Sequence, residues 1–303
     1  MELGFAVPVS GSWATPPAIA DIARRAEALG YRSLWTFQRL LAPLDGDEHR
    51  LDPQYRSVQD PLAVLAYLAA VTRTARLGVA VINAPYLAPV VLAKSLTTID
   101  HLSEGRLDVG IGGGWLREEF EAVGASYQHR GARVEEYVAL LQELWTAEVV
   151  DHDGTFYRVP RARVDPKPVQ QPHPPVLLGA TAEPALRRAG RIAAGWISSS
   201  RADLESIGRS IDVVRAAAVD AGRDPEGLRF VCRAVVQVRD DTRAPLVGSL
   251  PDIADDLRRL EAAGVTEAFI DLNFDPRIGS PEADPAVSLR RAHQVLEALA
   301  PGR

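Results

Sequence analysis

The feature that most constrains the fold is a repeated alternation of short apolar runs with amphipathic helical segments. The apolar runs lie at residues 3–9, 31–37, 76–82, 106–112, 175–180, 195–198, 229–238 and 267–272. Helical segments follow them, and their ends carry recognisable signals. Thr15 and Asp60, each followed by proline, are typical helix caps, and Gly30 is a typical stop. Nearly continuous apolar strands that alternate with helices indicate a parallel sheet covered by helices.

Eight such units in 303 residues favour an α/β fold of the (β/α)8 TIM-barrel type, with a doubly wound parallel sheet as the second possibility. No linker divides the chain, so we expect a single domain over residues 1–303. Residues 147–174 are the least regular part, which predicts an insertion after the fourth strand, with a small hairpin at residues 153–159. In such barrels the functional face is built from the strand-to-helix loops. The long ones here are 38–59, 83–88, 113–130 and 273–284.

Composition argues against several classes of function. The net charge of -6 and the absence of a basic block argue against a nucleic-acid partner. Cys232 is the single cysteine, so no disulfide framework is possible, and the six histidines lack metal-ligand spacing, so no metal site is expected. No apolar run reaches the roughly 18 residues of a membrane span, and the start MELGFAVPVSG lacks the charged n-region of a signal peptide. We therefore expect a cytoplasmic protein without a membrane partner.

The most informative short motif is RLDVGIGGGWLREEF, from Arg106 to Phe120. A dinucleotide fingerprint needs G-x-G-x-x-G after the first strand. Here the glycines follow the fourth strand, and Trp115 occupies the place of the last one, so that interpretation fails. Two interpretations stay open. The turn is either a nest of backbone N–H groups that a cofactor approaches closely, or a tight turn that needs glycine for its conformation alone.

The sequence around this turn resembles a known family. HLSEGRLDVGIGGGWLREEFEAVG is similar to the segment of bacterial luciferase-like flavin enzymes in which LS-GR ends the third helix, and a strand, a G-G-GW turn and a helix follow. AEALGYRSLWTFQR, TARLGVAVI and PVLLGATAEPALRRAGRIAAGW match the same family in the same order. The resemblance covers at least residues 1–200. It is greatest to the branch that uses the deazaflavin coenzyme F420.

This resemblance implies where a cofactor binds. It implies a non-prolyl cis peptide between Ala80 and Val81, in a bulge behind the cofactor ring. It also implies polar ring contacts after the second strand, where the family commonly has an acid followed by histidine and this chain has Gln38 and Arg39. The turns after the fourth and fifth strands flank the phosphate-bearing tail, although Thr181 is also a plausible helix cap. The implied cofactor-binding residues are Gln38, Arg39, Ala80, Val81, Gly112, Gly113, Gly114, Trp115, Gly179, Ala180 and Thr181.

The reacting groups are less well defined. Some relatives place a glutamate directly after the glycine turn as a proton donor, where this chain has Trp115. Glu118 and Glu119 are the nearest acids, and exposed acids in the first turn of a helix are the simpler interpretation of both. No catalytic residue is therefore assigned. Loops 38–59 and 273–284 are expected to form the substrate pocket, with His49 as a candidate contact.

We therefore expect an oxidoreductase that transfers hydride between coenzyme F420 and an unidentified small organic substrate. The first alternative is an FMN-dependent luciferase-like monooxygenase that receives reduced flavin from a separate reductase. The second is a non-catalytic flavin-binding barrel, because Gln38 and Arg39 replace the family's acid and histidine. The resemblance also implies a homodimer.

Overall fold

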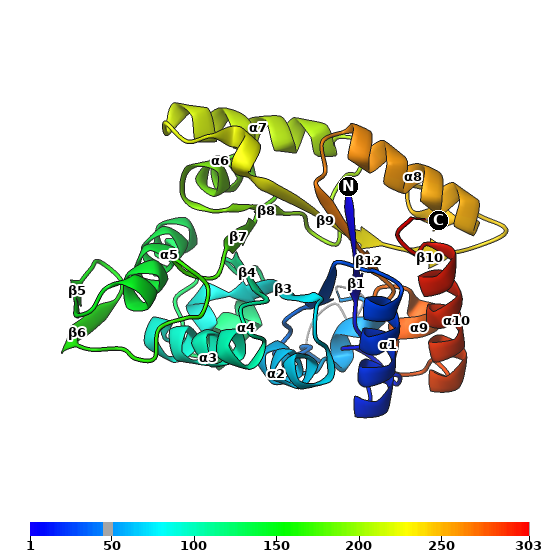
Figure 1. Cartoon of the computed structure of the whole chain (residues 1–303), viewed down its shortest axis with the longest axis horizontal. Helices are drawn as coiled ribbons and strands as arrows, with labels where there is room; N and C mark the ends of the chain where they lie inside the picture. Colours follow the sequence, from blue (N-terminus) through cyan, green and yellow to red (C-terminus); the bar gives the residue numbers. More distant parts are fainter. Residues whose placement is uncertain (45–50, 303) are drawn as a thin grey trace.

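In the computed structural model, which describes residues 1–44 and 51–302, eight parallel strands close into one barrel (Figure 1). The barrel strands are β1 (Glu2–Ala6), β2 (Ser33–Thr36), β3 (Arg76–Asn83), β4 (Leu107–Gly112), β7 (Val176–Gly179), β8 (Gly195–Ile197), β9 (Arg229–Val235) and β12 (Glu267–Asp271). Each pairs in parallel with the next along the chain, and β12 pairs with β1 to close the ring. The predicted (β/α)8 barrel is confirmed.

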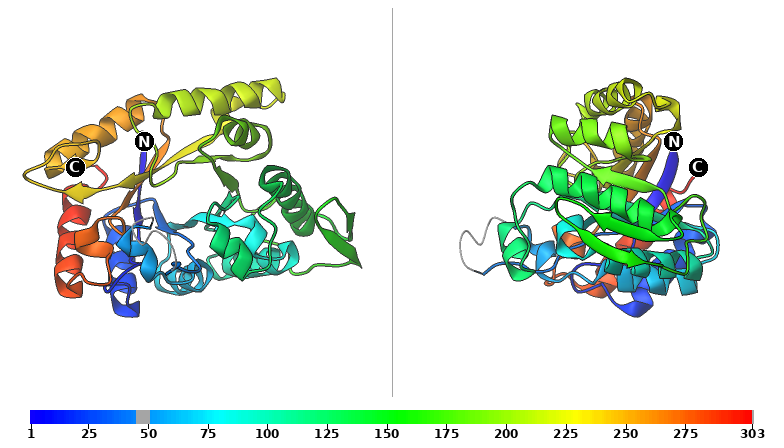
Figure 2. Two further views of the ribbon diagram at one scale, coloured as in Figure 1. Left: turned by 180° about the vertical axis from the view of Figure 1, so that it is seen from behind. Right: turned by 90° about the vertical axis from the view of Figure 1, so that its left-hand side faces the viewer.

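Helices surround this barrel. The long helices are α1 (Pro16–Ala28), α2 (Pro61–Val71), α3 (Pro89–Leu102), α5 (Arg130–Thr146), α6 (Glu183–Ile192), α7 (Ile207–Asp220), α8 (Leu250–Ala262) and α10 (Pro285–Ala298). Short helical pieces are α4 (Arg117–Ala122), α9 (Pro276–Gly279), η2 (Pro53–Arg56), η3 (Ala84–Tyr86) and η4 (Pro225–Gly227). The Thr15 and Asp60 side chains cap α1 and α2 as predicted, each accepting a backbone N–H. Helices α1 and α10 lie side by side (Figures 1 and 2). Within the described residues, no helix has the length and apolar character to span a membrane.

The irregular region after the fourth barrel strand contains a hairpin that stands outside the barrel, beside α5 (Figure 2). Its antiparallel strands are β5 (Val150–Asp153) and β6 (Arg158–Ala162). Glu136 of α5 holds the turn, because its carboxylate accepts the backbone N–H groups of Phe156 and Tyr157 at 2.9 and 2.8 Å. The hairpin predicted at residues 153–159 is therefore present.

The single strand predicted at residues 229–238 was too long. Residues 229–238 form two strands, because β10 (Gln237–Val238) leaves the barrel and pairs with β11 (Val247–Gly248). The apolar run continues through Val236 without a break. The hydrophobic pattern therefore does not reveal the change of pairing partner.

Ion pairs fill the barrel interior at the amino ends of its strands. Asp108, which is fully buried, accepts hydrogen bonds from Arg76 at 2.5 Å and from Arg229 at 2.7 Å. Arg229 also pairs with Glu267 at 2.7 Å. Burial alone would raise the pKa of Asp108, but the two guanidinium groups outweigh it and hold that pKa below its usual value. This network closes one end of the barrel, so a ligand can enter from the other.

We expect Asp108→Asn to lower the free energy of unfolding by about 3–5 kcal/mol, because it removes the buried carboxylate that two partly buried guanidinium groups share. Asp153→Asn, which breaks an exposed pair with Arg158, is the matched control and should have little effect. The pKa of Asp108 is lower in the folded chain than in the unfolded one. Its contribution is therefore present above about pH 4 and is lost as the pH falls through the folded value. Urea unfolding across this pH range measures both effects, and equal losses in the two variants would contradict the interpretation.

Candidate functional site

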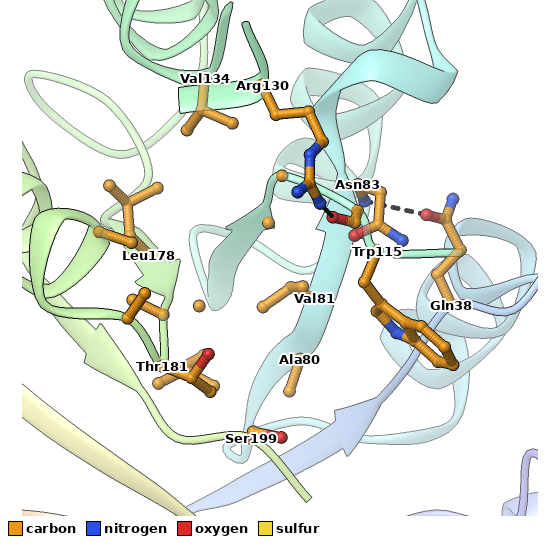
Figure 3. Close-up of a pocket in the computed structure, with 18 of the residues that line it drawn as sticks. Gln38, Ala80, Val81, Asn83, Trp115, Arg130, Val134, Leu178, Thr181 and Ser199 are labelled. Atoms are coloured by element: carbon orange, nitrogen blue, oxygen red, sulfur yellow. Dashed lines mark hydrogen bonds between the residues drawn. The ribbon is translucent and has the colours of Figure 1, made fainter. Parts of the chain in front are cut away.

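The carboxyl ends of the barrel strands surround a cavity of about 760 Å³. All eleven residues that the family resemblance implies for a cofactor line this cavity. They come from the ends of β2, β3, β4 and β7, which lie far apart in the sequence and meet at one rim because the strands are parallel (Figure 3). The fold thus gathers the whole predicted set into one place.

Val81 and two glycines form the floor of the cavity. The peptide between Ala80 and Val81 is cis, as the resemblance implies, and the pairing of β3 with β4 shifts in register there. A Cβ added to Gly112 would lie 2.5 Å from a methyl carbon of Val81, and one added to Gly179 would lie 2.9 Å from the other. Real Cβ atoms do not approach so closely. Packing against Val81 therefore requires both glycines, whether or not a ligand is bound.

The two glycines that follow Gly112 have different roles. Gly114 has φ +70°, in the left-handed region that favours glycine, and a Cβ there would lie 2.8 Å from the Phe120 ring. A Cβ on Gly113 would make only ordinary contacts, the nearest being 3.5 Å from Val134. Neither conformation nor packing within the described chain demands glycine at position 113, which lines the cavity.

Gln38 and Arg39 line the wall beyond β2. The Gln38 side-chain oxygen accepts the Asn83 N–H at 2.9 Å, which ties the loop after β2 to the end of β3 (Figure 3). The Arg39 guanidinium carbon lies 4.5 Å from the Tyr55 ring centroid and 4.9 Å from that of Trp115. Both contacts are within the range of cation–π attraction. Arg39 is therefore held in place by rings on the cavity wall.

Glu119 is not the exposed helix acid that the sequence suggested. Its side chain is buried, and its carboxylate lies 2.9 Å from Nη1 of Arg39. It also accepts the Leu40 N–H at 2.7 Å and the Tyr86 hydroxyl at 3.0 Å. Burial, and then the Glu119 carboxylate, raise the pKa of Tyr86. The expectation failed because the loop after β2 folds over α4, and helical position alone does not show that contact.

The opposite end of the cavity is bounded by α5 and α6. Arg130 donates from Nη1 to the Gly114 carbonyl oxygen at 2.6 Å (Figure 3), and Arg188 bonds to Glu135 at 3.2 Å. Ala182 is the residue at the N-cap of α6, so Thr181 precedes the cap and does not provide it. The start of α6 has no side-chain cap. Helix N–H groups and arginines at one cavity end suit an anion.

Sequence analysis missed Arg233 of β9, which lines the cavity and is 7% exposed. Its Nε bonds to Asp271 at 2.6 Å, and its Nη1 lies 3.4 Å from the Ala80 carbonyl oxygen on the far side of the barrel. A charged residue inside the apolar run RFVCRAVV was the available signal, since arginine is almost never buried unless it is paired. The neighbouring Cys232 is fully buried, which raises its pKa to about 12 and keeps the thiol unreactive.

The two loops expected to form the substrate pocket differ. Loop 38–59 contributes Gln38, Arg39 and Tyr55 to the lining, whereas no residue of loop 273–284 is among the described lining residues. The second loop instead packs on the strand ends, where the Asn273 side-chain oxygen accepts the Val9 N–H at 3.1 Å. His49 lies outside the described residues.

These features define a (β/α)8 barrel with a cofactor-sized cavity at the carboxyl ends of its strands. The model of the luciferase-like monooxygenase family matches residues 3–247, and the chain belongs to this family. An uncharacterized protein of Mycobacterium tuberculosis is 35% identical over 234 residues, which cover 74% of this chain and 80% of that protein. An FMNH2-dependent dimethylsulfone monooxygenase of Pseudomonas putida is 32% identical over 192 residues, covering 62% of this chain and 50% of that protein.

Solved structures extend the likeness over nearly the whole chain. The monooxygenase RslO1 from Streptomyces bottropensis has a TM-score of 0.80 at 21% identity, covering 99% of this chain and 98% of that one. An F420-dependent secondary alcohol dehydrogenase has a TM-score of 0.77 at 15% identity, covering 98% of both chains. The same fold therefore occurs in F420-dependent enzymes and in monooxygenases.

We expect Gly112→Ala to lower the melting temperature, because its new methyl carbon would overlap Val81 at a cost of about 1–3 kcal/mol. Gly113→Ala is the matched control and should leave the melting temperature nearly unchanged. Adding Val81→Ala to Gly112→Ala should restore part of the loss. Thermal unfolding followed by circular dichroism measures all three variants, and a larger loss from Gly113→Ala than from Gly112→Ala would refute the assignment.

Proposed function

We propose that this chain is an oxidoreductase that binds coenzyme F420 in the cavity and transfers hydride between it and a small organic substrate. The observation that carries the proposal is the convergence of the eleven predicted residues on one cavity with a strongly basic lining. No acidic residue is among the described residues that line it. The arginines in the lining are Arg39, Arg130, Arg188, Arg201 and Arg233.

The lining fits a planar ring that carries an anionic tail. Ala80 and Val81 offer an apolar floor, and Gly113 offers backbone that no side chain covers. Arg130 and Arg188, with the uncapped start of α6, would hold the phosphate of the tail. The ring would then lie across β3, with Arg39 at its edge.

The tail end supports F420 over FMN. F420 continues from its phosphodiester into glutamate carboxylates, whereas FMN ends at its phosphate. Arg188 and Arg191 of α6 both bond to a single carboxylate, that of Glu135, at 3.2 and 3.1 Å. Because one carboxylate balances only one of these two positive charges, this part of α6 stays positive. Such a surface suits a tail that carries several negative charges as it leaves the cavity.

The chain's own residues would position and shield the reaction. The bound cofactor would supply the hydride chemistry at its C5. Arg39 would donate a hydrogen bond to the ring edge from a position that Tyr55, Trp115 and Glu119 already fix. Trp115, which is 46% exposed at the rim, would be covered by bound ligand and would exclude water from the reacting atoms.

A second candidate function is that of an FMN-dependent monooxygenase. Its support is the 32% identity to the FMNH2-dependent dimethylsulfone monooxygenase and the likeness to the monooxygenase RslO1. In this function a separate reductase would supply the reduced FMN, and the same floor and Arg39 would hold the ring. A non-catalytic barrel that binds flavin is the third candidate.

Cofactor titration separates these candidates. We expect F420 to bind with a dissociation constant of about 1 μM or lower, and FMN to bind at least about tenfold more weakly, which corresponds to about 1.4 kcal/mol. Quenching of the tryptophan fluorescence and the cofactor's own fluorescence report binding. Tight binding of FMN without affinity for F420 would instead support the monooxygenase. Failure of both to bind near micromolar concentration would overturn the oxidoreductase proposal.

Arg188→Met tests the tail end of the proposed site. We expect it to weaken F420 binding about tenfold, because a charge-assisted contact to the tail is lost, and to weaken FMN binding less. Arg187→Met on the same helix is the matched control, because Arg187 pairs with Glu183 and is not among the lining residues. Equal losses of F420 affinity in the two variants would exclude Arg188 as a tail contact.

A further inference from the structure

A cluster of three aromatic side chains forms one wall beside the cavity. We call Phe37, Tyr55 and Phe274 the aromatic wall. The ring centroids of Phe37 and Phe274 lie 5.3 Å apart, and those of Tyr55 and Phe274 lie 5.2 Å apart. The wall joins three segments distant in sequence, namely the end of β2, the η2 turn and the loop after β12.

Two arginines from different strands lie against this wall. The Arg233 guanidinium carbon lies 4.5 Å from the Phe37 centroid and 4.3 Å from the Phe274 centroid. Arg39 lies over Tyr55 at 4.5 Å. Both arginines line the cavity, Arg39 just after β2 and Arg233 on β9, whereas Arg130 and Arg188 belong to α5 and α6. The part of the cavity beside the aromatic wall therefore combines apolar rings with two positive charges.

The carboxylates that balance these charges lie behind the guanidinium groups. Asp271 pairs with Arg233 and Glu119 pairs with Arg39, and both acids are buried and absent from the described cavity lining. A molecule in the cavity therefore meets N–H donors and positive charge first. An anion is favoured there over a cation, and a negative ligand does not face either carboxylate directly.

Arg233 retains a donor for such a ligand. Asp271 and the Ala80 carbonyl hold its Nε and Nη1. Within the described part of the chain, Nη2 has no hydrogen-bond partner, although the side chain is more than nine-tenths buried. Because Arg233 lines the cavity, this N–H group is free to donate a charge-assisted hydrogen bond to a ligand oxygen.

We propose that the substrate is a small organic acid whose carboxylate binds Nη2 of Arg233 while its apolar body packs on Phe37 and Tyr55, the two members of the aromatic wall that line the cavity. This inference rests on the proposed function and names the substrate class of the same site. Arg233 is a specificity-determining residue in this scheme, and Arg39 adds positive charge beside it. In this scheme Arg130 and Arg188 would hold the cofactor tail, and substrate and cofactor would bind together.

Benzoate and benzamide are suitable probes, because they share a shape and differ in charge. We expect isothermal titration to give an affinity for benzoate at least about tenfold above that for benzamide, a difference of about 1.4 kcal/mol. The titrations are run on the free protein and again after saturation with F420 or FMN. Benzoate should bind in both states, and displacement of benzoate by either cofactor would overturn the proposal by assigning Arg233 to the cofactor.

The variant Arg233→Met/Asp271→Asn removes the buried pair as a unit, so that no isolated charge is left to unfold the barrel. We expect it to lower the benzoate affinity at least about tenfold and to leave benzamide binding unchanged. Arg239→Met/Asp275→Asn is the matched control, because Arg239 and Asp275 also form a buried pair, at 2.7 Å, but do not line the cavity. Melting temperatures check that both variants fold.

The outcomes separate this proposal from the proposed function. Equal affinities for benzoate and benzamide, or equal losses in the two double variants, would overturn the organic-acid substrate whatever the cofactor result. Benzoate selectivity that depends on Arg233 would support it even if neither cofactor binds, because the free protein is titrated separately. In that case only the oxidoreductase assignment fails.

Discussion

The packing of Val81 against two strand ends without side chains is the contact on which the site depends. A Cβ at Gly112 or at Gly179 would overlap the Val81 methyl groups, so β3, β4 and β7 can meet at this point only with glycine on both flanks. The meeting of these strands sets the floor of the cavity. Gly113 then extends bare backbone beyond the packed region, and Gly114 turns the chain through its positive φ. Packing thus requires Gly112, backbone conformation favours glycine at position 114, and Gly113 lines the cavity without either requirement.

The sequence predicts the fold well because strand and helix periodicities are local. The eight apolar runs each overlap a barrel strand, and the parallel topology carries the ends of β2, β3, β4 and β7 to one rim. That is why eleven residues chosen from separate motifs line one cavity. The hydrophobic periodicity did not show that the chain leaves the barrel after β9 and that β10 pairs with β11. The change concerns the partner strand and not the hydrophobic pattern.

The side-chain partners at the site were not predictable in the same way. Glu119 meets the Leu40 N–H, 79 positions away, and Arg233 reaches the Ala80 carbonyl, 153 positions away. These contacts depend on how loops fold over the barrel mouth and on side chains that cross its interior. No spacing rule encodes them. An acid in the first turn of a helix is usually exposed, and only the folded chain shows that Glu119 is buried beneath Arg39.

Lys94 and Lys167 are the only lysines in this chain, so arginine provides nearly all of its basic side chains. The presence of an arginine therefore does not by itself indicate a functional site. The distinction between a structural and a functional arginine lies in how each guanidinium is enclosed. At the amino end of the barrel, Arg76 and Arg229 surround the Asp108 carboxylate, which is fully buried. At the carboxyl end the order is reversed, because the Asp271 carboxylate is buried behind Arg233 and the guanidinium lines the cavity. In the first arrangement the charges pair with one another inside the barrel. In the second, the guanidinium group can donate a hydrogen bond to a ligand in the cavity. Arginine–aspartate pairs therefore form an internal network at one end of the barrel, and at the other end such a pair leaves a guanidinium group facing the cavity.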